Sequence, residues 1–153
     1  MRFLLLTLLM SSALSVAVRA QQPDTPQPEP VLETGELMVM VIKPAYLDLQ
    51  QLMATPPADR QQWALLYQKA ARLAEFENLI LFRPHERSTT REWKTLAATA
   101  RQTTATLATA LLAELATAKA DDFATVRTRY EGIAVSCNAC HRAMSREAPT
   151  IRP

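Results

Sequence analysis

Only two glycines, Gly35 and Gly132, occur in this chain of 153 residues, and this scarcity limits the folds that the chain can adopt. Alanine and leucine, which are strong helix formers, are abundant beyond residue 30. A chain that is so poor in turn residues and so rich in helix formers is predicted to be all-α.

Hydrophobic spacing divides the chain into four expected helices. The seam of the first helix consists of residues spaced by 4, 3, 4 and 3 positions: Met38, Ile42, Ala45, Leu49 and Leu52. Pro44 lies within this helix and removes one backbone hydrogen bond, so a kink is expected there. The helices are expected to span residues 34–53, 59–82, 89–118 and 121–148, with Thr89 and Glu92 as a capping box at the start of the third.

Four helices of this length joined by short loops predict an antiparallel up-and-down four-helix bundle. In such a bundle, the start of the first helix, the loop between the second and third, and the end of the fourth lie at the same end. Any group attached near the end of the fourth helix is therefore expected at that end.

The last expected helix contains the sequence Cys137-Asn138-Ala139-Cys140-His141, and its C-x-x-C-H spacing is the attachment signature of a c-type haem. In such a site the two thiols add to the haem vinyl groups, and the histidine is an axial ligand of the iron. Cys137 and Cys140 are the only cysteines in the chain. The motif predicts one covalently bound haem c, attached through Cys137 and Cys140 and with its iron bound by His141.

The bundle geometry ranks the methionines as candidates for the second axial ligand. Met38 lies about one turn into the first helix, on its inward seam and at the end where the haem is expected. Met53 is 15 residues further along, roughly 22 Å along the helix axis, and so lies at the opposite end. Met40 is rotated by about 200° from Met38 and is the fallback candidate. Met144 stands beside His141 on the same helix and cannot cross to the opposite haem face.

Basic residues gather at the same expected end: Arg83, Arg87, Arg91 and Lys94. Two haem propionates would add two negative charges, with which arginine pairs bidentately, so Arg83 and Arg87 are predicted to bind the cofactor. The same basic rim could guide the docking of an acidic redox partner, an attraction that weakens with salt. His85 lies in the same loop, where histidine is more often solvated than ligating.

The N-terminus predicts export. Residues 1–20 have a basic start, an apolar run and small residues at their end, as in a signal peptide. The apolar run is shorter than the roughly 20 residues of a membrane-spanning helix, so no membrane insertion of the mature chain is expected. Residues 21–33 are expected to be a Pro-rich, disordered leader, residues 34–148 the helical domain, and residues 149–153 a tail. Covalent haem on an exported chain fits a bacterial periplasm.

The charge of the chain argues against nucleic-acid binding. Its net charge of +2 comes from Arg2 and Arg19, both in the expected signal peptide, so the mature chain is near neutral. A nucleic-acid-binding protein would need a strongly basic face. The distribution is uneven, since residues 21–82 carry 4 basic and 8 acidic side chains and residues 83–153 carry 11 basic and 7 acidic ones.

These features resemble the class II c-type cytochromes, the cytochrome c-prime group and its low-spin relatives. The resemblance covers nearly the whole mature domain and rests on residues 35–38, 41–45, 73–79 and 137–141. It implies a four-helix bundle with a C-terminal haem motif, and a methionine early in the first helix as sixth iron ligand, which maps onto Met38. Family members are often homodimers. Met144 and Ser145 depart from the family, which often has an aromatic and then a basic residue at these positions.

The leading hypothesis is a periplasmic one-electron carrier with His141 and Met38 as axial ligands, and not an enzyme, because no pocket with general acid or base groups is evident. The alternative is a five-coordinate protein that binds or buffers nitric oxide or carbon monoxide. It would require an apolar side chain to cover the distal haem face: Leu37, Val41 or Ile42.

Two further alternatives use the same motif without haem. A thiol–disulfide oxidoreductase would use Cys137 and Cys140, but such pairs usually begin a helix beside a sheet, where the thiol pKa is lowered. A zinc site would combine both cysteines with His141 and His85, although Cys140 and His141 diverge by about 100° around a helix.

Overall fold

The computed structural model describes residues 29–83, 90–115, 123–145 and 147–153, and in these ranges it is helical without strands. Its elements are α1 (Thr34–Leu37), the π-helix η1 (Met38–Ile42), α2 (Lys43–Leu52), α3 (Arg60–Asn78), the 3₁₀-helix η2 (Leu79–Phe82), α4 (Arg91–Glu114) and α5 (Phe123–Met144). The all-α prediction is confirmed for this part of the chain. The expected signal peptide and residues 21–28 of the leader lie outside the described residues.

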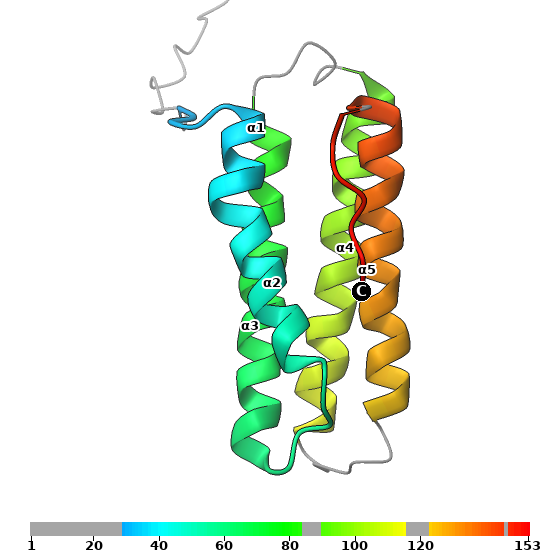
Figure 1. Ribbon diagram of the computed structural model, residues 1–153. Helices are drawn as coiled ribbons and strands as arrows, with labels where there is room; N and C mark the ends of the chain where they lie inside the picture. Colours follow the sequence, from blue (N-terminus) through cyan, green and yellow to red (C-terminus); the bar gives the residue numbers. More distant parts are fainter. Residues whose placement is uncertain (1–28, 84–89, 116–122, 146) are drawn as a thin grey trace, which may run out of the picture.

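The helices lie side by side, with α1, η1 and α2 following one another without a break (Figure 1). Helix α3 packs against α4, α4 packs against α5, and α2 packs against α3. The start of α1, the start of α4 and the end of α5 lie at the same end of the structure (Figure 1). Helices α2 and α5 share at most a marginal backbone contact. Residues 147–153, here called the C-terminal strap, run along the side between them (Figure 1).

The irregularity expected at Pro44 takes the form of the π-helix η1, which ends two residues before the proline. A proline has no N–H to donate, and its ring clashes with the carbonyl four residues earlier in a regular helix. The backbone N–H of Lys43 instead donates to the carbonyl oxygen of Met38, five residues back, so the turn before Pro44 is widened. Such π turns are frequent at functional sites, and here the turn begins at the candidate ligand Met38.

Side-chain caps fix where two of the helices begin. The Asp59 carboxylate accepts a hydrogen bond of 2.8 Å from the backbone N–H of Gln62 at the start of α3. The Thr90 hydroxyl accepts one of 3.1 Å from the backbone N–H of Trp93 at the start of α4. The cap of α4 is therefore Thr90 and not Thr89, which itself lies outside the described residues.

The core lies between the helices and contains the seams that the hydrophobic spacing predicts. Among its fully buried side chains are Leu37, Leu49, Trp63, Leu73, Leu107, Leu111 and Ile133. The strap joins this core, because Ile151 packs against it. None of the described helices combines the length and the apolar character needed to cross a membrane.

Candidate functional site

Helix α5 presents Cys137, Cys140 and His141 on one side of its last two turns. Both cysteines are free thiols and half-buried. At about 100° per residue, His141 lies about 40° from Cys137 around the helix axis. Cys140 lies on the other side of Cys137, about 60° away from it. The three side chains of the motif therefore face the same part of the molecule.

The ring of His141 is held by the C-terminal strap. Its Nδ1 atom lies 3.0 Å from the carbonyl oxygen of Pro149. A carbonyl oxygen can only accept a hydrogen bond, so Nδ1 must carry the proton and donate it. In the neutral ring, the Nε2 atom then keeps its lone pair, and this is the tautomer that can bind a metal through Nε2.

Burial makes the two thiols weak acids. It is the main cause that raises the pKa of Cys137 to about 12, and the negative charges of Glu77 and Cys140 act in the same direction. Burial also raises the pKa of Cys140. Since the thiolate is the nucleophile in thiol–disulfide exchange, a pair with raised pKa values is poorly suited to that chemistry.

The structure separates the candidate methionine ligands by their environment. Met38 is half-buried and packs against the same hydrophobic core as Cys137. Met40 is 63% exposed, and Met53 is buried with 1% exposure. Leu37 is fully buried beside Met38 in the chain. Of the two methionines at the start of the first helix, Met38 is thus the one that contacts the core.

The predicted propionate partners are only partly described. Arg83 is half-buried, and its Nε atom is buried without a hydrogen-bond partner in the described part of the chain. Arg87 and the alternative ligand His85 lie outside the described residues. Arg83 therefore has a buried donor to offer at the end of η2, as a propionate partner would need.

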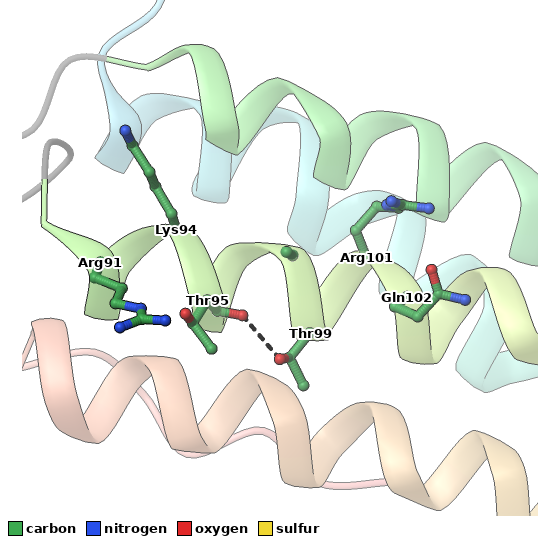
Figure 2. Close-up of a pocket in the computed structure, with 7 residues that line it drawn as sticks. Arg91, Lys94, Thr95, Thr99, Arg101 and Gln102 are labelled. Carbon is green, nitrogen blue, oxygen red and sulfur yellow. Dashed lines mark hydrogen bonds between the residues drawn. The ribbon is translucent and has the colours of Figure 1, made fainter.

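The other two basic residues of this end, Arg91 and Lys94, are exposed on α4. They line a shallow hollow of about 740 Å³ on this helix (Figure 2). The remaining lining residues also belong to α4: Thr95, Ala98, Thr99, Arg101 and Gln102. Arg91 and Lys94 thus form an exposed basic surface at the start of α4, here called the α4 basic face.

Sequence analysis missed one buried ionisable residue, Glu77. Its side chain is 1% exposed, and its Oε2 atom has no hydrogen-bond partner among the described residues. Burial raises its pKa to about 7, against the opposing effects of the Thr104 hydroxyl and the Arg101 charge. Its charge also acts on the Cys137 thiol, so it lies near the candidate attachment site.

The spacing of the apolar residues in α3 indicates that Glu77 is buried. The buried positions Trp63, Leu66, Ala70 and Leu73 recur every three or four residues, and Glu77 continues that series. A charged residue on the inward seam of a helix is unusual, because a charged group loses its hydration on burial. This position could have been identified from the sequence as a buried acid.

The described residues contain no group of three or more His, Cys, Asp or Glu side chains placed to hold a metal ion. Cys137, Cys140 and His141 do not form such a group by themselves, although all three are described. The zinc alternative also relied on His85, which lies outside the described residues.

Comparison of this chain with models of protein families, with curated proteins and with solved structures finds no match. The resemblance to class II c-type cytochromes remains a prediction that rests on the motifs of the chain.

Proposed function

We propose that this protein is an exported class II c-type cytochrome that carries single electrons. In this proposal one haem c is attached to Cys137 and Cys140, and its iron is bound by His141 and Met38. The fold is an antiparallel up-and-down four-helix bundle with the haem at the end where α1 begins and α5 ends. The observation that carries the proposal is the hydrogen bond of His141 Nδ1 to Pro149, which leaves Nε2 free beside two unpaired thiols.

The residues present fit a covalently bound haem. Two free thiols, an imidazole with its Nδ1 proton fixed, and a half-buried thioether at the same core make up the donor set of a His/Met cytochrome. Arg83 adds a buried donor without a partner among the described residues, which suits a propionate. The proposal is therefore supported by the match between these side chains and the groups that bind a haem.

Each of these side chains has a separate task. The thiols fix the cofactor to α5, the imidazole of His141 holds its proton on Nδ1 and offers Nε2, and the core around Met38 keeps its thioether on the inner side of η1. When bound, the haem supplies the ferrous–ferric couple. A group held through both His141 and Met38 would have little to rearrange on electron transfer, which suits a carrier.

The five-coordinate alternative has one observation in its favour. Leu37 is fully buried and Ile42 is 9% exposed, whereas Met38 between them is only half-buried. If one of these apolar side chains covers the distal face, the protein binds or buffers nitric oxide or carbon monoxide.

The proposal includes export and a protein partner. Residues 1–20 act as a signal peptide, and the mature chain works in a bacterial periplasm. The α4 basic face, with Arg91 and Lys94 exposed at the haem end, receives an acidic redox partner.

Mass analysis of the mature polypeptide tests the proposal. We expect a chain that begins near Gln21, carries the added mass of one haem and keeps its colour after denaturation. A variant with both cysteines replaced, Cys137→Ser and Cys140→Ser, should lose that mass, and the matched control Ala139→Ser inside the same motif should keep it. A wild-type chain without added tetrapyrrole would contradict the proposal.

The ferric absorption spectrum then separates the two haem functions. A methionine-to-iron charge-transfer band supports the electron carrier. A high-spin spectrum without this band supports the gas-binding alternative.

A further inference from the structure

One side-chain amide of α5, that of Asn138, bonds the C-terminal strap twice. Asn138 Nδ2 donates to the carbonyl oxygen of Ile151, and its Oδ1 accepts from the backbone N–H of Ile151, both at 2.8 Å. Because the donor and the acceptor of one side chain bind the same backbone residue, the strap cannot slide along α5 without breaking both bonds.

The far end of the strap is attached to α2. The carbonyl oxygen of Arg152 accepts hydrogen bonds from Tyr46 Oη at 2.8 Å and from Gln50 Nε2 at 3.0 Å. These two donors lie one turn apart on α2. The strap therefore ties α2 to α5 along the side where the two helices themselves share at most a marginal contact.

These anchors place a carbonyl group at the candidate iron ligand. Pro149 lies two residues before Ile151, and Asn138 lies three residues before His141, so the anchor and the histidine are neighbours on α5. Around the helix, His141 lies between Cys137 on one side and Asn138 on the other, about 40° and about 60° away. The imidazole thus stands between the thiol side of the helix and the strap side.

Proline suits this position in the strap. Its ring fixes φ, which limits the conformations of the strap at the residue that bonds His141. The group that it offers to His141 is its carbonyl oxygen, at 3.0 Å from Nδ1.

We propose that the C-terminal strap is a positioning element for the proximal ligand, and that Asn138 is the residue that sets it. This inference rests on the proposed function. The strap keeps the proton on Nδ1 of His141, restrains the rotation of the ring and directs Nε2 toward the iron. A hydrogen bond of this kind makes the imidazole a more basic ligand, which favours the oxidised iron.

The test compares the haem-loaded variant Asn138→Ala with the matched control Asn78→Ala. Asn78 is an asparagine of α3 whose side chain bonds Glu75 at 3.0 Å and not the strap. In Asn138→Ala we expect the His141 Nδ1 proton and the Ile151 amide proton to exchange with solvent about fivefold faster or more. We also expect the reduction potential to rise. Both quantities should stay at their wild-type values in the control.

A second variant, Gln50→Ala, removes one bond at the α2 end of the strap and leaves the haem motif unchanged. It should shift exchange and potential in the same direction by a smaller amount, and it serves as the test if Asn138→Ala does not fold. Removal of residues 147–153 should give the largest shift.

The outcomes separate this inference from the proposed function. Haem-loaded Asn138→Ala and Gln50→Ala proteins with wild-type exchange and potential would overturn the positioning role and leave the proposed function standing. A destabilised Asn138→Ala variant with unchanged potential would make the strap a purely structural feature and also overturn the inference. A wild-type protein without haem would overturn the proposed function and the ligand role together.

Discussion

Tyr46 and Tyr130 meet between α2 and α5, with their hydroxyl oxygens 3.2 Å apart and their rings stacked at a centroid distance of 6.0 Å. The hydroxyl of Tyr130 donates to that of Tyr46, which in turn donates to the carbonyl oxygen of Arg152. Both side chains are buried, and burial raises the pKa of each phenol. The pair is one of the side-chain links between these two helices; at the other end of α2, Arg127 Nη1 of α5 donates to the carbonyl oxygen of the C-cap residue Met53 at 3.1 Å.

The direction of these hydrogen bonds predicts unequal effects of removing the two hydroxyls. Tyr46→Phe removes the donor to Arg152 and the acceptor of Tyr130, leaving a buried hydroxyl unpaired, and should lower the free energy of unfolding by about 1–3 kcal/mol. Tyr130→Phe removes one bond and should cost about 0.5–1.5 kcal/mol. Urea denaturation measures both, with Tyr67→Phe on α3 as a control. Equal costs, or a larger cost for Tyr130→Phe, would contradict the order of the chain of hydrogen bonds.

The buried carboxyl of Glu77 predicts a pH dependence of stability. Its pKa in the folded protein is about 7, above the ordinary value of 4.5, with burial as the main cause. The folded protein therefore binds this proton more tightly than the unfolded chain does. This tighter proton binding adds on the order of 3 kcal/mol to the free energy of unfolding. The added stability is complete below about pH 4.5 and is lost as the pH rises through about 7.

Replacing this carboxyl by an amide should remove that pH dependence. The Glu77→Gln variant cannot ionise, so at about pH 8 it should be more stable than the wild type, and at about pH 4 the two should differ little. Denaturation at several pH values measures the difference, and Glu75→Gln, at an exposed position of the same helix, is the matched control. If the stability advantage of Glu77→Gln were the same at all pH values, burial of an ionisable carboxyl would not be its cause.

The sequence predicted the helices and the motif because both depend on local information. Scarce glycine and the three- and four-residue spacing of apolar side chains indicate helices, and the relative positions of Cys137, Cys140 and His141 follow from helix geometry alone. Pro44 indicated the irregularity of the first helix. Its form as a π-helix depends on where the displaced hydrogen bond finds a new partner.

The strap could not be predicted in this way. Its bonds to α2 and α5 use the backbone groups of Pro149, Ile151 and Arg152, which any sequence offers. Asn138 occupies one of the two variable positions of the C-x-x-C-H motif, so the motif predicts no role for its side chain. Glu77 differs from the strap, since its place on the seam of α3 was visible in the spacing.

The environments of Met38 and Met40 predict different effects of removing their thioethers. Met38→Leu keeps about the same side-chain volume and should cost less than about 1.5 kcal/mol of stability, and under the proposed function it should leave the haem attached. It should abolish the methionine charge-transfer band and lower the reduction potential, because thioether ligation raises it. Met40→Leu, at a side chain that is 63% exposed, should change neither. The reverse pattern would assign the iron bond to Met40.

Under the proposed function, the α4 basic face predicts how fast the reduced protein would lose its electron to small charged oxidants. Arg91 and Lys94 are exposed at the end of the structure where α5 ends, whereas α3 begins with Arg60 at the opposite end (Figure 1). An anionic oxidant such as ferricyanide is attracted to this face. The double variant Arg91→Gln and Lys94→Gln should therefore react about three- to tenfold more slowly with it at low ionic strength.

Salt and the sign of the oxidant's charge identify the cause of this effect. At about 1 M salt the Debye length falls to about 3 Å, so the rates of the variant and the wild type should converge. A cationic cobalt complex used as oxidant should react faster with the variant than with the wild type, because a repulsive charge has been removed. Arg60→Gln removes one positive charge at the far end, half the change of the double variant, and should leave both rates nearly unchanged. If Arg60→Gln slowed ferricyanide by as large a factor per charge removed as the double variant does, the total charge of the protein would govern the rate, and the α4 basic face would have no special part in electron transfer.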